Sequence, residues 1–197
     1  MGLSRLILDW KSVERYNYES EVEKLERWAE RVWKDGGTRA IEIGCWKGYS
    51  TLCLAQFFKV LAIDLWGDVN DGNSEPDLIG RHSFPDFIKS VVDHNVLGKR
   101  VIPFIGTSDV LMDLSFGKAD LIFIDGNHSY AAARRDYLNV RNSLQKERGL
   151  VVFHDYKRDV KGHEPGQAGV EQLVDELVEC GELKVFEHFE GIIALHR

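Results

Sequence analysis

One stretch, residues 39–58 (RAIEIGCWKGYSTLCLAQFF), constrains the fold more than any other part of the chain. Residues 40–43 form a short apolar run around one acid, which suits a buried strand. A turn bounded by Gly44 and Gly48 follows, and the apolar segment after it has the length of a helix. This order predicts strand, tight loop and helix, the unit in which an open α/β sheet binds a ligand at the carboxyl end of a strand.

The residues of the loop narrow the choice of ligand. A dinucleotide fingerprint that starts at Gly44 needs glycines at positions 46 and 49, but the chain has Trp46 and Tyr49 there. NAD is therefore disfavoured. The phosphate-binding loop typical of ATP-binding proteins also fails, because Lys47 precedes its glycine and no Gly-Lys-Ser/Thr follows at the required distance.

The pattern that remains is Glu42-x-Gly44-x-x-x-Gly48, with Ser50 at the start of the helix. It favours a nucleoside that carries an amino-acid tail in place of phosphates, which is the shape of S-adenosylmethionine. A second apolar run ends in Asp64, twenty residues after Gly44. An acid at that position can accept hydrogen bonds from both ribose hydroxyls.

Composition excludes several other classes of protein. With 197 residues the chain is long enough for one domain with a sizeable core, and its net charge of −7 disfavours binding to the nucleic-acid backbone. Its three cysteines form no CxxC pair, which favours a reducing compartment over a disulfide framework. No apolar run has the length of a membrane span, and no signal peptide is evident. We expect a cytoplasmic protein with no membrane partner.

Strand and helix patterns alternate along the rest of the chain. They predict a Rossmann-like, doubly wound α/β fold, in which a seven-stranded, mostly parallel sheet has one antiparallel edge strand. Residues 1–37, a loose arm and one helix started by a Ser20–Glu23 capping box, precede residues 38–197 within one structural domain. The predicted strands are residues 40–43, 59–64, 101–105, 119–125, 149–154, 183–188 and 192–196.

Polar residues follow the fourth and fifth predicted strands. Asp125 and His128 lie in one such segment, and His154 and Asp155 lie in the other. Successive parallel strands bring these residues to the edge that holds Gly44, where two carboxylates and two imidazoles can hold a divalent cation. Aspartate oxygens suit Mg²⁺ or Mn²⁺, and His154 as a third ligand favours Mn²⁺ or another transition metal.

Three motifs together resemble one family. IEIGCWKGYST, FIDGNHSY and FHDY occur in the order and spacing of the class I S-adenosylmethionine-dependent O-methyltransferases, in the group that includes catechol O-methyltransferase and the macrolide-sugar O-methyltransferases. The similarity covers the chain from about Thr38 onward. It implies transfer of a methyl group to a hydroxyl of a small molecule, with S-adenosylmethionine and a divalent metal, Mg²⁺ or Mn²⁺, as cofactors.

The resemblance also implies a role for each motif residue. At the cofactor, Glu42, Gly44, Gly48 and Ser50 would serve the methionine part, Trp46 would line the site, Asp64 would hold the ribose and Ser108 would lie near the adenine. At the metal, Asp125 would be shared with the cofactor, His154 and Asp155 would be ligands, and His128 would be the base. Two of these residues depart from the commonest family pattern, namely Trp46 in place of a glycine and His154 in place of an acid.

Each motif also has a structural interpretation. The two glycines can serve only to form a tight turn, and Asp125 and Asp155 can cap the helices that follow them. His154 can donate a hydrogen bond to a metal ligand without binding the metal itself. Two other functions stay open, a catalytically silent cofactor-binding or accessory protein and a related enzyme of a biosynthetic pathway that is not a methyltransferase. The acceptor and the pathway are not encoded in any motif, and a homodimer is left open.

Overall fold

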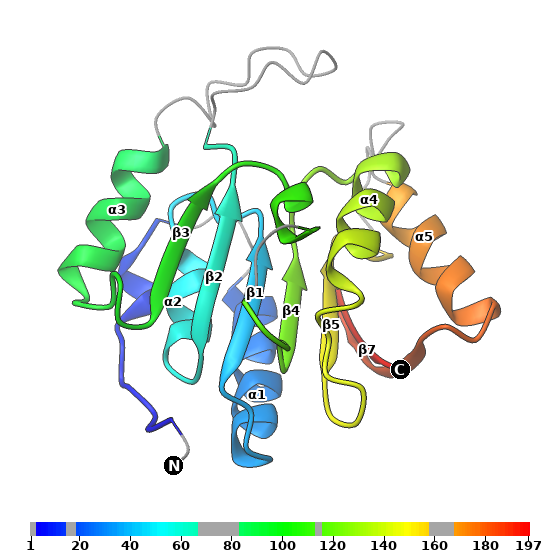
Figure 1. The fold of residues 1–197 in the computed structure, drawn as a ribbon, viewed down its shortest axis with the longest axis horizontal. Helices are drawn as coiled ribbons and strands as arrows, with labels where there is room; N and C mark the ends of the chain where they lie inside the picture. Colours follow the sequence, from blue (N-terminus) through cyan, green and yellow to red (C-terminus); the bar gives the residue numbers. More distant parts are fainter. Residues whose placement is uncertain (1–2, 15–18, 67–82, 113–115, 158–167) are drawn as a thin grey trace.

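The computed structural model describes residues 3–14, 19–66, 83–112, 116–157 and 168–197 (Figure 1). Its centre is a seven-stranded sheet in the order β3-β2-β1-β4-β5-β7-β6. The first five strands run parallel, β7 runs antiparallel to both of its neighbours, and β6 forms the edge of the sheet. The predicted fold class is confirmed, with the reversed strand one place in from the edge.

The seven predicted strands have bounds within two residues of the observed ones. The strands are β1 Arg39–Ile43, β2 Lys59–Asp64, β3 Val101–Ile105, β4 Leu121–Ile124, β5 Leu150–His154, β6 Lys184–Phe189 and β7 Ile192–His196. The helices are α1 Glu19–Lys34, α2 Tyr49–Ala55, α3 Ser83–Asp93, α4 Tyr130–Val140 and α5 Ala168–Glu179, with short 3-10 turns η1 Trp10–Ser12 and η2 Ser108–Met112.

Helices cover both faces of the sheet, which explains why the central strands are apolar on both sides. Ala40 of β1 packs in a core cluster with residues of α1, α2 and α3, whereas Ile41 packs in a second cluster with residues of α4 and α5. Because side chains alternate along a strand, these two consecutive residues point to opposite faces of the sheet and into different cores. The carboxyl ends of the parallel strands β1 to β5 all lie on one side of the sheet, and the candidate site lies at these strand ends (Figure 1).

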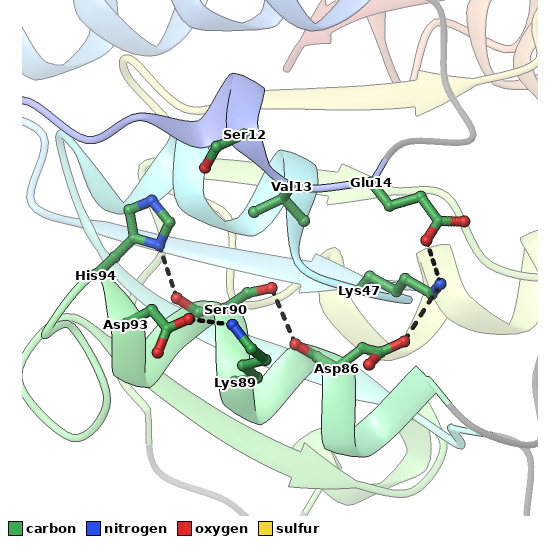
Figure 2. Close-up of a pocket in the computed structure, with 9 residues that line it drawn as sticks. All are labelled: Ser12, Val13, Glu14, Lys47, Asp86, Lys89, Ser90, Asp93 and His94. Carbon is green, nitrogen blue, oxygen red and sulfur yellow. Dashed lines mark hydrogen bonds and ion pairs between the residues drawn. The ribbon is translucent and has the colours of Figure 1, made fainter.

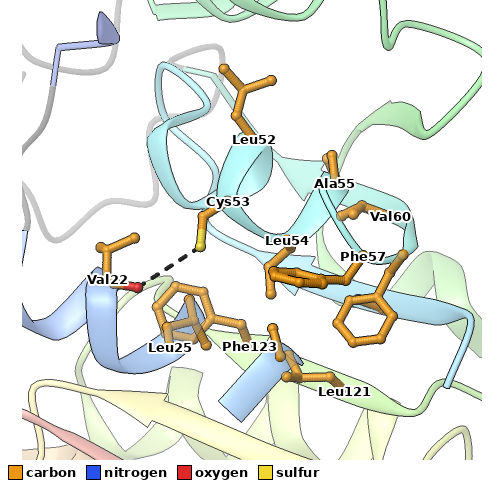
Figure 3. Packing of buried hydrophobic residues seen from close by; sticks show 14 of the residues in the cluster. Val22, Leu25, Leu52, Cys53, Leu54, Ala55, Phe57, Val60, Leu121 and Phe123 are labelled. Atoms are coloured by element: carbon orange, nitrogen blue, oxygen red, sulfur yellow. Dashed lines mark hydrogen bonds between the residues drawn. The ribbon is translucent and has the colours of Figure 1, made fainter. Parts of the chain in front are cut away.

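The first core packs α1 and α2 against strands of the sheet (Figure 3). Leu25 of α1, Leu54 of α2 and Phe123 of β4 are each no more than 1% exposed. Burial of a side chain of this size is worth about 1.5–3 kcal/mol. This packing therefore holds α1, which precedes the sheet in sequence, firmly against it.

The N-terminal segment is not the loose arm expected from its lack of a pattern. Within residues 3–14, Trp10 is 4% exposed and meets Tyr49 edge-to-face with ring centroids 4.9 Å apart. The predicted capping box is also wrong, because Ser20 is the second residue of α1 and its hydroxyl donates to Glu190 at 2.6 Å. Contacts distant in sequence decide both features, so local patterns could not reveal them.

Among the residues that the structure describes, no helix is both long and apolar enough to cross a membrane.

Candidate active site

The loop between β1 and α2 requires glycine at its first position. Gly44 has a φ of +84°, and a Cβ atom there would lie 2.1 Å from the backbone oxygen of Asp125. The loop is therefore packed against the segment that follows β4. Only a residue without a side chain permits this approach of two backbones.

Asp64, at the end of β2, holds the same loop in place. Its Oδ2 accepts hydrogen bonds from the backbone N–H groups of Cys45 and Trp46 at 2.6 and 2.8 Å, and its Oδ1 accepts one from Trp66 at 2.8 Å. The indole N–H of Trp66 in turn donates to the backbone oxygen of Trp46 at 2.7 Å. Asp64 thus organises the loop, in addition to the ribose role that the resemblance implies.

Glu42 lies beneath the loop and is fully buried. The hydroxyl groups of Ser50 and Thr51 each donate to its carboxylate at 2.5 Å. Burial raises the pKa of Glu42 to about 7, although these two hydrogen bonds oppose the rise. Glu42 and Ser50 therefore form an internal network that joins β1 to the start of α2.

A cavity of about 270 Å³ opens beside the loop. Four of the eight residues assigned to the cofactor line it, namely Gly44, Asp64, Ser108 and Asp125. Glu42, Trp46, Gly48 and Ser50 are not among the lining residues of this cavity. The rest of the lining comes from Ile43, Ile63, Leu65, Gly106, Thr107, Gly126, Asn127, Arg135 and Asp136.

Ser108, which the resemblance places near the adenine, lines the cavity beside the loop. The hydroxyl is buried, donates to Asp136 at 2.6 Å and accepts from Asn139 at 2.9 Å. Burial raises the pKa of the Asp136 carboxyl, and the hydrogen bond from Ser108 opposes this rise. Asp136 of α4 is a polar group at the cavity that sequence reasoning missed.

An acid–histidine cluster adjoins this cavity, and all four predicted residues meet in it. Nδ1 of His154 lies 2.8 Å from Asp125 Oδ1 and 3.4 Å from Asp155 Oδ1. Nδ1 of His128 lies 2.8 Å from Asp155 Oδ2, and its Nε2 lies 3.4 Å from Asp125 Oδ1. Asp155 has a φ of +58°, a conformation that aspartate tolerates better than most residues.

The charges of the cluster shift its pKa values strongly. Burial lowers the pKa of His128, but Asp125 and Asp155 outweigh it and raise the value to about 9. For His154 the same balance, with Asp125 dominant, raises the pKa to about 10. Burial raises the pKa of Asp125, but the charge of His154 and the hydrogen bonds of both histidines hold it well below its usual range.

The donor atoms of this cluster fit a divalent cation. One ligand atom each from Asp125, His128 and His154 lies within 4.8 Å of the others, a spacing that one ion can bridge at ordinary ligand distances. Asp155 adds a fourth group that contacts both histidines. The mixture of carboxylate oxygen and imidazole nitrogen suits Mn²⁺ better than Mg²⁺.

A residue that sequence reasoning missed contacts this cluster from the N-terminal helix. Glu21 of α1 is 1% exposed, and its Oε2 lies 3.1 Å from Nε2 of His154. The helical period could have revealed it, because position 21 lies on the same face of the helix as Leu25, Trp28 and Val32. A carboxylate at a core position of an amphipathic helix is unusual and needs a partner.

A second cavity of about 270 Å³ lies on the outer side of the loop (Figure 2). Lys47 forms ion pairs with Glu14 of the N-terminal segment at 2.6 Å and with Asp86 of α3 at 3.2 Å. His94 contacts the backbone oxygen of Ser90 at 2.8 Å. These contacts tie the N-terminal segment and α3 to the glycine loop, and the cavity does not border the acid–histidine cluster.

Comparisons with known proteins identify the family of this chain. The profile of a family described as a methyltransferase domain matches residues 41–156, which is more than half of the chain. The chain therefore belongs to this methyltransferase family, and the prediction of a methyltransferase is confirmed. No curated protein matches it.

Solved structures share the fold at low sequence identity. An O-methyltransferase from Bacillus cereus in complex with SAH is 16% identical, with a TM-score of 0.66 over 95% of this chain and 86% of that one. PaMTH1, an SAH-bound methyltransferase from Podospora anserina, is 18% identical, with a TM-score of 0.63 over 98% and 89%. TomG, an O-methyltransferase of Streptomyces achromogenes involved in tomaymycin synthesis and solved with SAM, is 16% identical, with a TM-score of 0.63 over 88% and 77%.

Proposed function

We propose that this protein is an S-adenosylmethionine-dependent O-methyltransferase that uses a divalent cation to methylate a hydroxyl of a small molecule. One observation carries the proposal. Asp125 lines the cavity beside the glycine loop and also contacts His128 and His154. A single carboxylate therefore borders both a nucleoside-sized cleft and a cluster suited to proton transfer, which is the proximity that group transfer requires.

The residues of the cavity suit a nucleoside whose ribose carries no phosphate. Gly44 and Gly126 expose backbone beside the loop, and Asp64 supplies carboxylate oxygens at the end of β2. Asp64 already accepts three backbone hydrogen bonds, and a carboxylate offers about four acceptor positions. One position is left for a ribose hydroxyl while the loop stays intact.

We assign Asp125, His154 and Asp155 as the residues that would hold a divalent cation, and we keep His128, which shares the compact donor set with Asp125 and His154, as the base. When bound, the cation would lower the pKa of an acceptor hydroxyl and would favour the neutral form of the neighbouring imidazoles. Oδ1 of Asp125 and Oδ1 of Asp155 both lie near Nδ1 of His154, at 2.8 and 3.4 Å, so these three groups already converge on one point.

His128 is the candidate base. Its side chain is 27% exposed, whereas that of His154 is 5% exposed, so only His128 is open to an acceptor that arrives from solvent. Asp155 contacts Nδ1 of His128 at 2.8 Å and orients the ring. A base in this position takes the proton of the acceptor hydroxyl as the oxygen gains its methyl group.

The test uses binding and turnover together. Thermal shifts with S-adenosylhomocysteine, NAD and ATP, each with and without Mg²⁺ or Mn²⁺, should single out S-adenosylhomocysteine. Labelled S-adenosylmethionine should then transfer its methyl group to members of a panel of catechols, sugars and other hydroxyl compounds, and EDTA should suppress the transfer. Binding without turnover across the panel would favour the accessory-protein alternative, and unchanged turnover in EDTA would remove the cation from the proposal.

A further inference from the structure

Glu21 links three distant parts of the chain at the acid–histidine cluster. It lies in the first turn of α1, and its Oε2 meets Nε2 of His154 at the end of β5 at 3.1 Å. Its Oε1 accepts a hydrogen bond from the backbone N–H of Gly191, in the turn between β6 and β7, at 3.0 Å. The carboxylate is thus fixed at both oxygens, and it is fixed against elements more than 130 positions away.

This contact decides which nitrogen of His154 faces the cluster. An ionised carboxylate only accepts hydrogen bonds, so the Nε2 that faces Glu21 carries a proton. The other nitrogen, Nδ1, points to Asp125 at 2.8 Å and to Asp155 at 3.4 Å. A neutral His154 held in this way presents the lone pair of Nδ1 to whatever the two aspartates bind. A carboxylate that accepts a hydrogen bond from one ring nitrogen of a metal-binding histidine commonly fixes the tautomer and turns the other nitrogen toward the metal.

Core packing alone gives no reason for an acid at position 21. Leu25, Trp28 and Val32 fill the same face of α1 and are each no more than 3% exposed. An apolar residue in the first turn would continue this face without the cost of burying a carboxylate. His154 itself is 4% exposed and stands edge-on to Phe123 at 6.4 Å, so apolar packing would hold the ring without selecting its protonated nitrogen.

We infer that Glu21 is a positioning residue, which fixes His154 with Nε2–H toward α1 and so directs Nδ1 to the cation site of Asp125 and Asp155. The inference deepens the proposed function, because it concerns the cation that the proposal assigns to this cluster. It also gives the N-terminal helix, which lies outside the matched methyltransferase region of residues 41–156, a part in building the site.

The substitution Glu21→Gln tests the inference without a change in size. The N–H of Gly191 keeps the amide oxygen as its acceptor, so the amide NH₂ faces Nε2 of His154. Nε2 must then accept, and the proton moves to Nδ1, where it points at Asp125. Loss of such a supporting group typically weakens metal binding 10- to 100-fold, and we expect a decrease in that range. Glu23→Gln is the matched control, because Glu23 lies on the same helix with an exposed ion pair to Lys11.

Two measurements of metal binding decide the matter, and neither depends on turnover. Titration with Mn²⁺, followed by electron paramagnetic resonance of the free ion, gives the dissociation constant of each variant. Nitrogen-15 correlation spectra of the histidine rings with Zn²⁺ bound report which nitrogen of His154 is protonated. We expect Nε2 to be protonated in the wild type and in Glu23→Gln. In Glu21→Gln we expect loss of the zinc-dependent shift of His154 or protonation at Nδ1.

Other outcomes would overturn the inference. If Glu21→Gln lowers the melting temperature but binds Mn²⁺ as tightly as the wild type with Nε2 protonated, the role of Glu21 is structural only. If the wild type binds neither cation, Glu21 has no metal site to serve, and the methyl-transfer assay then shows separately whether a metal-independent methyltransferase remains. If both cations bind but no acceptor is methylated, the proposed function fails while the positioning role stands.

Discussion

The carboxylate of Asp64 lies 2.6 Å from the backbone nitrogen of Cys45 and fixes the glycine loop to the end of β2. The same oxygen accepts from Trp46. Two neighbouring strands of the sheet are thereby joined at the point where a ligand would enter, so the shape of the loop depends on an acid outside it.

Replacement of this acid should affect both the loop and ligand binding. Asp64→Asn puts an NH₂ group where one backbone N–H now finds an acceptor, which leaves a donor unpaired. We expect a loss of about 1–3 kcal/mol in the free energy of unfolding by urea denaturation, together with weaker binding of S-adenosylhomocysteine by calorimetry. Asp86→Asn, which alters only an exposed partner of Lys47, serves as the control. Equal losses in the two variants would argue against the loop contact.

Gly44→Ala should be far more damaging than the same change at Gly98. Both glycines have positive φ, +84° and +71°, so both substitutions carry the backbone strain of that region. Only at Gly44 would the new methyl group meet backbone, at 2.1 Å from the oxygen of Asp125, whereas nothing lies within 4 Å at Gly98. Gly44→Ala should therefore cost about 1–3 kcal/mol more in denaturation experiments. Similar costs at both positions would mean that the two backbones can separate freely.

Glu42 should make stability depend on pH in a defined window. Its pKa is about 7 in the folded protein and 4.5 as the ordinary value, so the unfolded chain releases the proton first as pH rises. The Glu42 contribution to stability is therefore present below pH 4.5 and lost as pH rises to about 7. The change is on the order of 3 kcal/mol. Glu42→Gln should flatten the urea-derived stability curve between these pH values, while Glu23→Gln should leave its slope as in the wild type.

His128→Ala should slow catalysis strongly and spare cofactor binding. Removal of a general base typically slows turnover about 10²- to 10⁴-fold, and we expect a loss in this range in single-turnover methyl transfer. His128 does not line the cavity beside the glycine loop, so the affinity for S-adenosylhomocysteine should stay within about threefold of the wild type. His94→Ala, on the outer side of the loop, should keep full activity. A full rate in the His128 variant would exclude it as the base.

Local patterns in the chain were sufficient to predict most of the fold. The predicted bounds of β2 and β3 agree with the observed ones, because each strand is a short apolar run between breaks. The glycine loop followed from the spacing of Gly44 and Gly48. The presence of Asp125 and Asp155 in one cluster followed from one rule, that parallel strands bring their carboxyl ends to the same side of the sheet.

Contacts between distant residues escaped that reasoning. Trp10 lies in a segment without a periodic pattern, but its ring packs on Tyr49 of α2. The hydroxyl of Ser108 donates a hydrogen bond to Asp136, a residue of α4 that no local pattern singled out. Neither pairing produces a pattern among residues close in sequence, because each forms only when two separate elements pack against each other.

The amino-acid sequence by itself determined the order of strands and helices, the loop that only glycine can form, and the set of residues gathered at one edge of the sheet. The repeat of apolar residues every two positions in strands and every 3.6 in helices can be recognised within short stretches of sequence. The fixed handedness of strand connections then limits how these elements are arranged. Only the tertiary structure decided which nitrogen of His154 faces the cluster, because that choice depends on Glu21, 133 positions away. The packing of α1 against the sheet brings the two together.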